Sequence, residues 1–73
     1  MYKAQYYVDN ADEIGWKDVE AYTIGGEGPT LLLIDKQEAI DLASARHNVR
    51  GDNVRVLKWN RTKLKWEQIK IKF

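Results

Sequence analysis

Residues 35–50, DKQEAIDLASARHNVR, carry the strongest helix signal in the chain. Asp35 is a favourable N-cap because its carboxylate can accept a hydrogen bond from a free backbone N–H, and Glu38 three residues later completes a capping box. Asn48 or Gly51 can adopt the left-handed conformation that ends a helix. The pattern therefore predicts one helix over residues 36–49.

The apolar face of this helix is narrow. Ile40, Ala43 and His47 recur at helical spacing, and small alanines flank them. Small side chains suit a helix that lies close against a sheet. A helix of this length is marginal by itself in water, so the remaining sequence must supply the surface that it covers.

The segments on either side of the helix have strand character. Residues 2–8 alternate in polarity, residues 16–24 form a second candidate strand, and residues 30–34 are a short apolar run that is a buried strand or leads into the helix. Residues 53–59 and 64–73 form the strongest hairpin signal. The order predicts a single α+β domain over residues 1–73, with an antiparallel sheet of four or five strands and one helix packed on one face (ββαββ).

The C-terminal hairpin has two unlike faces. The expected register places Trp59 opposite Leu64 and Leu57 opposite Trp66. The face expected against the helix carries Val54, Val56, Ile69, Ile71 and Phe73, and the other carries Leu57, Trp59, Leu64 and Trp66. Two interpretations remain open: the tryptophans face outward as an interaction site, or a β-bulge near Glu67 turns them into the core.

Charge is divided unevenly along the chain, although the net charge is only +1. Residues 1–49 hold four basic and nine acidic side chains, whereas residues 50–73 hold eight basic and two acidic ones. Such a split marks an anion-binding face, or it reflects attraction between helix and sheet. The candidate partner-binding residues are Arg55, Lys58, Trp59, Arg61, Lys63, Lys65, Trp66, Lys70 and Lys72.

The expected register also brings two like charges together. Lys58 and Lys65 would stand directly opposite each other, which is unfavourable, and Glu67 on the diagonal relieves this only in part. An anionic partner would relieve it further, and Trp59 and Trp66 are available to stack bases or to anchor an interface. Nucleic acid and an acidic protein surface are both consistent with this pattern.

Several other functions lack the residues that they need. The chain has no cysteine and one histidine, which excludes a thiolate metal site and gives His47 no second imidazole with which to share a metal. The glycine-rich stretch at residues 25–30 lacks the P-loop lysine, and Ser44 beside His47 has no oxyanion hole. We therefore expect neither an enzyme nor a cofactor. With no long apolar run and no signal-peptide pattern, we expect a soluble cytoplasmic protein without a membrane partner.

The order hairpin, capped helix, hairpin resembles the small ββαββ accessory proteins encoded by phages and mobile elements, some of which are anti-CRISPR inhibitors of type I effector complexes. The residues that carry the resemblance are Glu38-Ala39-Ile40, Leu42-Ala43-Ser44, Gly51, Val54-Arg55-Val56 and Trp66. The resemblance covers most of the chain, and residues 25–30 are an insertion relative to the shortest members. It implies a non-catalytic factor that docks on a host protein or nucleoprotein complex through the C-terminal hairpin; the alternative is a direct nucleic-acid-binding module using the same surface.

Overall fold

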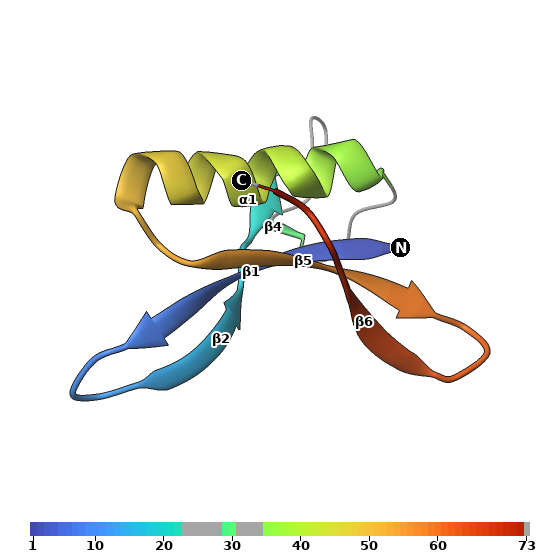
Figure 1. Ribbon diagram of the computed structural model, residues 1–73, viewed down its shortest axis with the longest axis horizontal. Coiled ribbons are helices and arrows are strands. Elements are labelled where there is room, and N and C mark those ends of the chain that lie inside the picture. The colour runs from blue at the N-terminus through green and yellow to red at the C-terminus, as the bar shows by residue number, and fades with distance from the viewer. Residues whose placement is uncertain (23–28, 31–34, 73) are drawn as a thin grey trace.

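The computed structural model describes residues 1–22, 29–30 and 35–72 and confirms the predicted α+β fold in ββαββ order (Figure 1). The elements are β1 (Tyr2–Asp9), β2 (Ile14–Asp18), β3 (Ala21–Tyr22), β4 (Pro29–Thr30), α1 (Lys36–Arg50), β5 (Val54–Asn60) and β6 (Lys65–Ile69). Within the described residues, four strands form an antiparallel sheet in the order β2-β1-β5-β6, and β3 and β4 form a separate pair beside α1.

Local signals place both ends of α1. The Asp35 side chain accepts a hydrogen bond from the Gln37 backbone N–H at 2.8 Å, so the predicted N-cap is confirmed. The helix ends at Gly51 rather than at Asn48. Gly51 has φ +73°, and its N–H donates to the His47 carbonyl at 2.9 Å.

The main core lies between α1 and the two central strands, β1 and β5. It is built from side chains that are fully buried and small or β-branched: Ala4, Ala39, Ala43 and Val56. The predicted contact through Ala43 is therefore confirmed, and Ile40 packs at the edge of this cluster. His47 is half-buried, and its Nδ1 lies 2.9 Å from the Asp52 carbonyl oxygen, beside the helix C-terminus.

The second predicted strand, residues 16–24, is wrong in its bounds. β2 begins earlier, at Ile14, and ends at Asp18, after which the Val19 N–H donates to the Ala4 carbonyl at 2.9 Å. The chain then leaves the main sheet, and β3 pairs with β4. Of the predicted strand at residues 30–34, only Thr30 lies within the described residues.

The predicted register of the C-terminal hairpin is wrong by two residues. Trp59 pairs with Trp66, and Val56 pairs with Ile69. The cause lies in the loop, where Asn60 Oδ1 accepts hydrogen bonds from the backbone N–H groups of Thr62 and Lys63, both at 3.0 Å. Leu64 follows with φ +52°, so residues 61–64 form the loop and β6 starts at Lys65.

This shift corrects three expectations. Leu64 belongs to the loop rather than to the strand face. Lys58 pairs with Glu67 and Lys65 pairs with Asn60, so the predicted lysine repulsion is absent at this pair of positions. The pairing from Val56 to Asn60 runs without interruption, which removes the proposed bulge near Glu67. A shift of two residues leaves each side chain on the same face, so the predicted separation of the two faces holds.

Candidate partner-binding surface

The sheet has one face against α1 and one face turned away from it, which we call the distal face. Because Ala4 and Val56 pair with each other and are buried under the helix, side-chain alternation turns their immediate neighbours in β1 and β5 to the distal face. With the paired residues of the edge strands, the distal face carries Lys3, Gln5, Tyr7, Ile14, Trp16, Asp18, Arg55, Leu57, Trp59, Trp66 and Gln68. Of the two placements that the sequence left open for Trp59 and Trp66, the structure shows the one on the face away from α1.

Each hairpin presents one aromatic pair on this face. Tyr7 and Trp16 lie edge to face with ring centroids 5.3 Å apart, and Trp59 and Trp66 do the same at 5.4 Å. Both separations and both tilted geometries are favourable for aromatic contacts. Trp59 and Trp66 are half-buried and Trp16 is 37% exposed, so each pair keeps surface that a partner could cover.

A cation from the opposite hairpin covers each edge tryptophan. The Arg55 guanidinium carbon, on β5, lies 4.2 Å from the ring centroid of Trp16 on β2. The Lys3 ammonium nitrogen, on β1, lies 4.6 Å from the ring of Trp66 on β6. Both are within the range of a cation–π interaction, so the two hairpins are joined by side chains as well as by the β1–β5 ladder.

A polar row across the centre of the face holds these cations in place. Gln5, only 8% exposed, donates from Nε2 to Asp18 Oδ1 at 2.7 Å and accepts from Arg55 Nε at 2.7 Å. Lys3 Nζ lies 3.4 Å from the same Asp18 oxygen. Burial lowers the pKa of Arg55, and Asp18 opposes this effect. Since Gln5 uses both ends of its amide, the row is a satisfied network that fixes the Arg55 position.

The two hairpins repeat one arrangement about an approximate two-fold axis. The axis passes between Ala4 and Val56, so Lys3 on β1 corresponds to Arg55 on β5, and Gln5 corresponds to Leu57. The cross-strand pair of Lys3 and Leu57 is thus equivalent to the cross-strand pair of Arg55 and Gln5. In the same way, Tyr7 paired with Trp16 corresponds to Trp59 paired with Trp66. The distal face is thus a single surface with two similar arms.

The structure does not bring the nine predicted site residues onto one face. Arg55, Trp59 and Trp66 share the distal face. Lys58 and Lys65 are exposed on the opposite face of the hairpin, and Arg61 and Lys63 are exposed in its loop. Lys70 and Lys72 are exposed in the segment after β6. Apart from Arg55, the predicted basic residues therefore surround the C-terminal hairpin rather than forming one patch with the tryptophans.

The predicted site omits the N-terminal half of this surface, which consists of Lys3, Gln5, Tyr7, Trp16 and Asp18. A signal was present: a basic residue, a small apolar residue, two variable positions and an aromatic residue occur at residues 3–7 and again at residues 55–59. Each run is followed by a loop and a tryptophan. The overall sequence similarity of the two hairpins is otherwise low, so only the contacts make the repeat clear.

Two hollows lie beside these elements. One, of about 530 Å³, is lined by Met1, Lys58, Trp59 and Arg61, which include one aromatic and two cationic residues. The backbone N–H of Trp59 donates a hydrogen bond to the backbone carbonyl of Met1 at 3.0 Å, and this bond holds the N-terminus beside the hollow. This hollow has the composition of an anion subsite.

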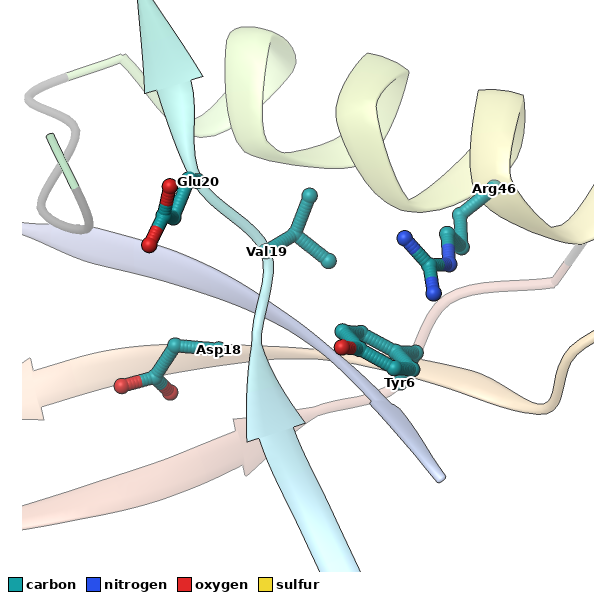
Figure 2. Close-up of a pocket in the computed structure, with 5 residues that line it drawn as sticks. All are labelled: Tyr6, Asp18, Val19, Glu20 and Arg46. Atoms are coloured by element: carbon teal, nitrogen blue, oxygen red, sulfur yellow. The ribbon is translucent and has the colours of Figure 1, made fainter. Parts of the chain in front are cut away.

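The second hollow, of about 260 Å³, lies between α1 and the β1–β2 hairpin and is lined by Tyr6, Asp18, Val19, Glu20 and Arg46 (Figure 2). The Arg46 guanidinium carbon is 3.6 Å from the Tyr6 ring centroid, and Arg46 Nε donates to Asp52 Oδ2 at 2.8 Å. Figure 2 shows the carboxylates of Asp18 and Glu20 on the other side of Val19. The charged groups do not converge, so this hollow lacks the geometry of a catalytic site.

Among the described residues, no cluster of three or more His, Asp or Glu side chains could hold a metal ion. Within the same residues, α1 is neither long nor apolar enough to cross a membrane. Comparisons of this chain with protein-family models, with curated proteins and with solved structures found no match.

Proposed function

We propose that this protein is a non-catalytic binding protein that engages a protein partner through the distal face. The observation that carries the proposal is the pair of aromatic clusters, Tyr7 with Trp16 and Trp59 with Trp66, on a sheet face that no described element covers. Binding surfaces are enriched in tryptophan, tyrosine and arginine at the positions that contribute most affinity.

Order within the surface supports this proposal. The hydrogen bonds among Gln5, Asp18 and Arg55 hold the central side chains before a partner arrives. A surface that is already ordered loses less side-chain entropy on association. The resemblance to phage-encoded accessory proteins supports the narrower proposal that the partner is a host protein or nucleoprotein complex that the protein inhibits.

The test is the double substitution Trp59→Ser and Trp66→Ser. Both side chains lie outside the core under α1, so we expect the far-UV circular dichroism spectrum to stay native while partner capture from host lysate is lost. Interface anchors of this kind contribute more than about 2 kcal/mol each. Ala45→Ser, on the exposed side of α1, is the control and should leave capture unchanged. Unchanged capture by the double variant would overturn the proposal.

A second candidate function, direct nucleic-acid binding, is favoured by the hollow lined by Met1, Lys58, Trp59 and Arg61. A base could stack on Trp59 while the cations meet phosphates. Binding of single-stranded DNA or RNA oligonucleotides should then weaken steeply with salt. Lys63→Ala or Lys65→Ala should each flatten the logarithmic salt dependence by about one unit if each contacts a phosphate. No binding at low salt would eliminate this candidate.

A further inference from the structure

The loops that end the two hairpins carry opposite charge. Residues 9–13, at the end of β1–β2, include the exposed acidic side chains Asp9, Asp12 and Glu13 and no basic residue. Residues 61–65, at the end of β5–β6, include the exposed basic side chains Arg61, Lys63 and Lys65 and no acidic residue. We call these segments the acidic tip and the basic tip.

Each tip also exposes one large aliphatic side chain. Ile14, next to the acidic tip, is 75% exposed, and Leu64, in the basic tip, is 73% exposed. Each stands two residues before the edge tryptophan of its own hairpin, Trp16 or Trp66. The tips are therefore alike in apolar content and opposite in charge.

Both tips project to the same side of the molecule. In Figure 1 the loop between β1 and β2 and the loop between β5 and β6 curve away from α1, one at each end of the distal face. A second molecule that approaches the distal face would meet the two tips before it met the central strands.

The charges of the tips remain available to a partner. At the acidic tip Glu13 pairs with Lys17, whereas among the described residues neither Asp9 nor Asp12 forms an ion pair. At the basic tip, Glu67 has a lowered pKa because Asn60 donates to its carboxylate and because Lys63, Lys65 and Lys58 surround it. A single carboxylate thus faces several lysines, so the basic tip keeps a positive potential.

We propose that the distal face is self-complementary and that two copies of this chain form a two-fold symmetric dimer, acidic tip against basic tip. A two-fold axis that lies in the interface plane, across the line joining the tips, places the acidic tip of each copy on the basic tip of the other. Both charge contacts form in one closed, isologous dimer, with Ile14 of one copy near Leu64 of the other. A second copy is the expected partner because its basic tip is complementary in charge to the acidic tip of the first copy, and its acidic tip to the basic tip.

The dimer would occupy the surface that the proposed function assigns to a partner. Partner binding and self-association would then compete. Dilution or added salt would dissociate the dimer and expose the distal face to a partner. The two proposals are nevertheless separable, because self-association is measured on the pure protein and partner capture is measured with the Trp59→Ser and Trp66→Ser variant.

The test is sedimentation velocity on the pure protein. We expect a monomer and dimer equilibrium that shifts to dimer up to about 1 mM protein at about 20 mM salt and returns to monomer at about 1 M salt, where charges are screened beyond about 3 Å. A wild type that stays monomeric at the highest concentration and lowest salt overturns the proposal. Growth beyond the dimer also overturns it, because open-ended association lacks the two-fold arrangement.

Charge-reversal variants make the test specific. Asp9→Lys with Asp12→Lys gives two basic tips, and Arg61→Glu with Lys63→Glu gives two acidic tips. Each variant alone should be monomeric, and an equal mixture should restore a one-to-one dimer. Lys70→Glu with Lys72→Glu, which changes the net charge as much as the variant with two acidic tips but lies outside the tips, should dimerise like the wild type. A mixture that stays monomeric while both variants keep native circular dichroism spectra overturns the assigned contacts.

Discussion

Two asparagines shape the hairpin loops with the same side-chain atom. Asn10 Oδ1 accepts hydrogen bonds from the backbone N–H groups of Asp12 and Glu13, both at 2.9 Å. Asn60 Oδ1 does the same for Thr62 and Lys63. Asn60 also donates from Nδ2 to a Glu67 carboxylate oxygen, so one side chain closes the loop and contacts the neighbouring strand.

Replacement of Asn60 by alanine should destabilise the protein by about 1 kcal/mol, since two backbone donors lose their protein partner but can reach water. Urea denaturation followed by tryptophan fluorescence measures this change. Asn10→Ala is the matched variant, because it removes the same loop bonds without a Glu67 contact. If Asn60→Ala costs no more than Asn10→Ala, the Glu67 contact adds nothing to stability.

The lowered pKa of Glu67 predicts a pH dependence. Hydrogen bonding by Asn60 is the largest cause, followed by the nearby lysines. A carboxyl whose pKa is lower in the folded state contributes stability above its ordinary pKa, and that stability is lost as pH falls through the folded-state pKa. NMR titration should therefore show the pKa of Glu67 rising in Asn60→Ala. Glu67→Gln should flatten the acid limb of the stability curve slightly, since Glu67 is solvent-accessible; an identical limb would contradict the prediction.

At the scale of single elements, α1 lies close to the sheet because its inner face is made of alanine. Ala39 and Ala43 are both 0% exposed and pack against Ala4 and Val56. This contact could be predicted from the small residues and helical spacing alone. The spacing predicted contact through Ile40, Ala43 and His47 with Ala39 only at their flank, because a spacing pattern marks a stripe and does not show where along it the sheet ends.

Ala43→Leu should therefore overpack the core and destabilise the protein by about 1 to 3 kcal/mol. Ala45→Leu, on the exposed side of the same helix, keeps a good helix former and should change stability by less than about 0.5 kcal/mol. Thermal melts of both variants measure the difference. Equal melting temperatures would mean that α1 does not pack through Ala43.

The contacts between the two hairpins should be energetically coupled. A double-mutant cycle with Arg55→Ala and Trp16→Ala is expected to give a coupling energy of about 0.5 to 1 kcal/mol, the size of a partly exposed cation–π contact. The control cycle combines Trp16→Ala with Lys36→Ala, which lies at the start of the helix on the other side of the sheet. Coupling that is no larger than in the control would contradict the cross-hairpin contact.

Across the whole molecule, the sequence predicted the sheet face of each side chain better than it predicted which residues pair across the C-terminal hairpin. Alternation of polarity predicted that Val56 and Trp59 lie on opposite faces of the hairpin, and a shift by two residues could not change that result. The register depended on the hydrogen bonds that Asn60 Oδ1 accepts from the backbone of its own loop and on a left-handed Leu64, neither of which hydrophobic patterning can show. The charge split was likewise visible in the sequence, but its placement at two hairpin tips required the strand order.

The central position of β1 has a consequence for how the chain reaches this structure. β1 pairs with β2 early in the sequence, but its other edge pairs with β5, whose residues come after the whole helix. Ala4 therefore meets Val56 only when the intervening chain has closed, and the entropy of that closure must be lost before the core contacts form. During synthesis, the edge of β1 that pairs with β5 therefore stays unpaired until β5 has been synthesised. The rate of folding should be governed by the β1–β5 ladder, so Val56→Ala should slow refolding, whereas changes confined to the tips should mainly speed unfolding.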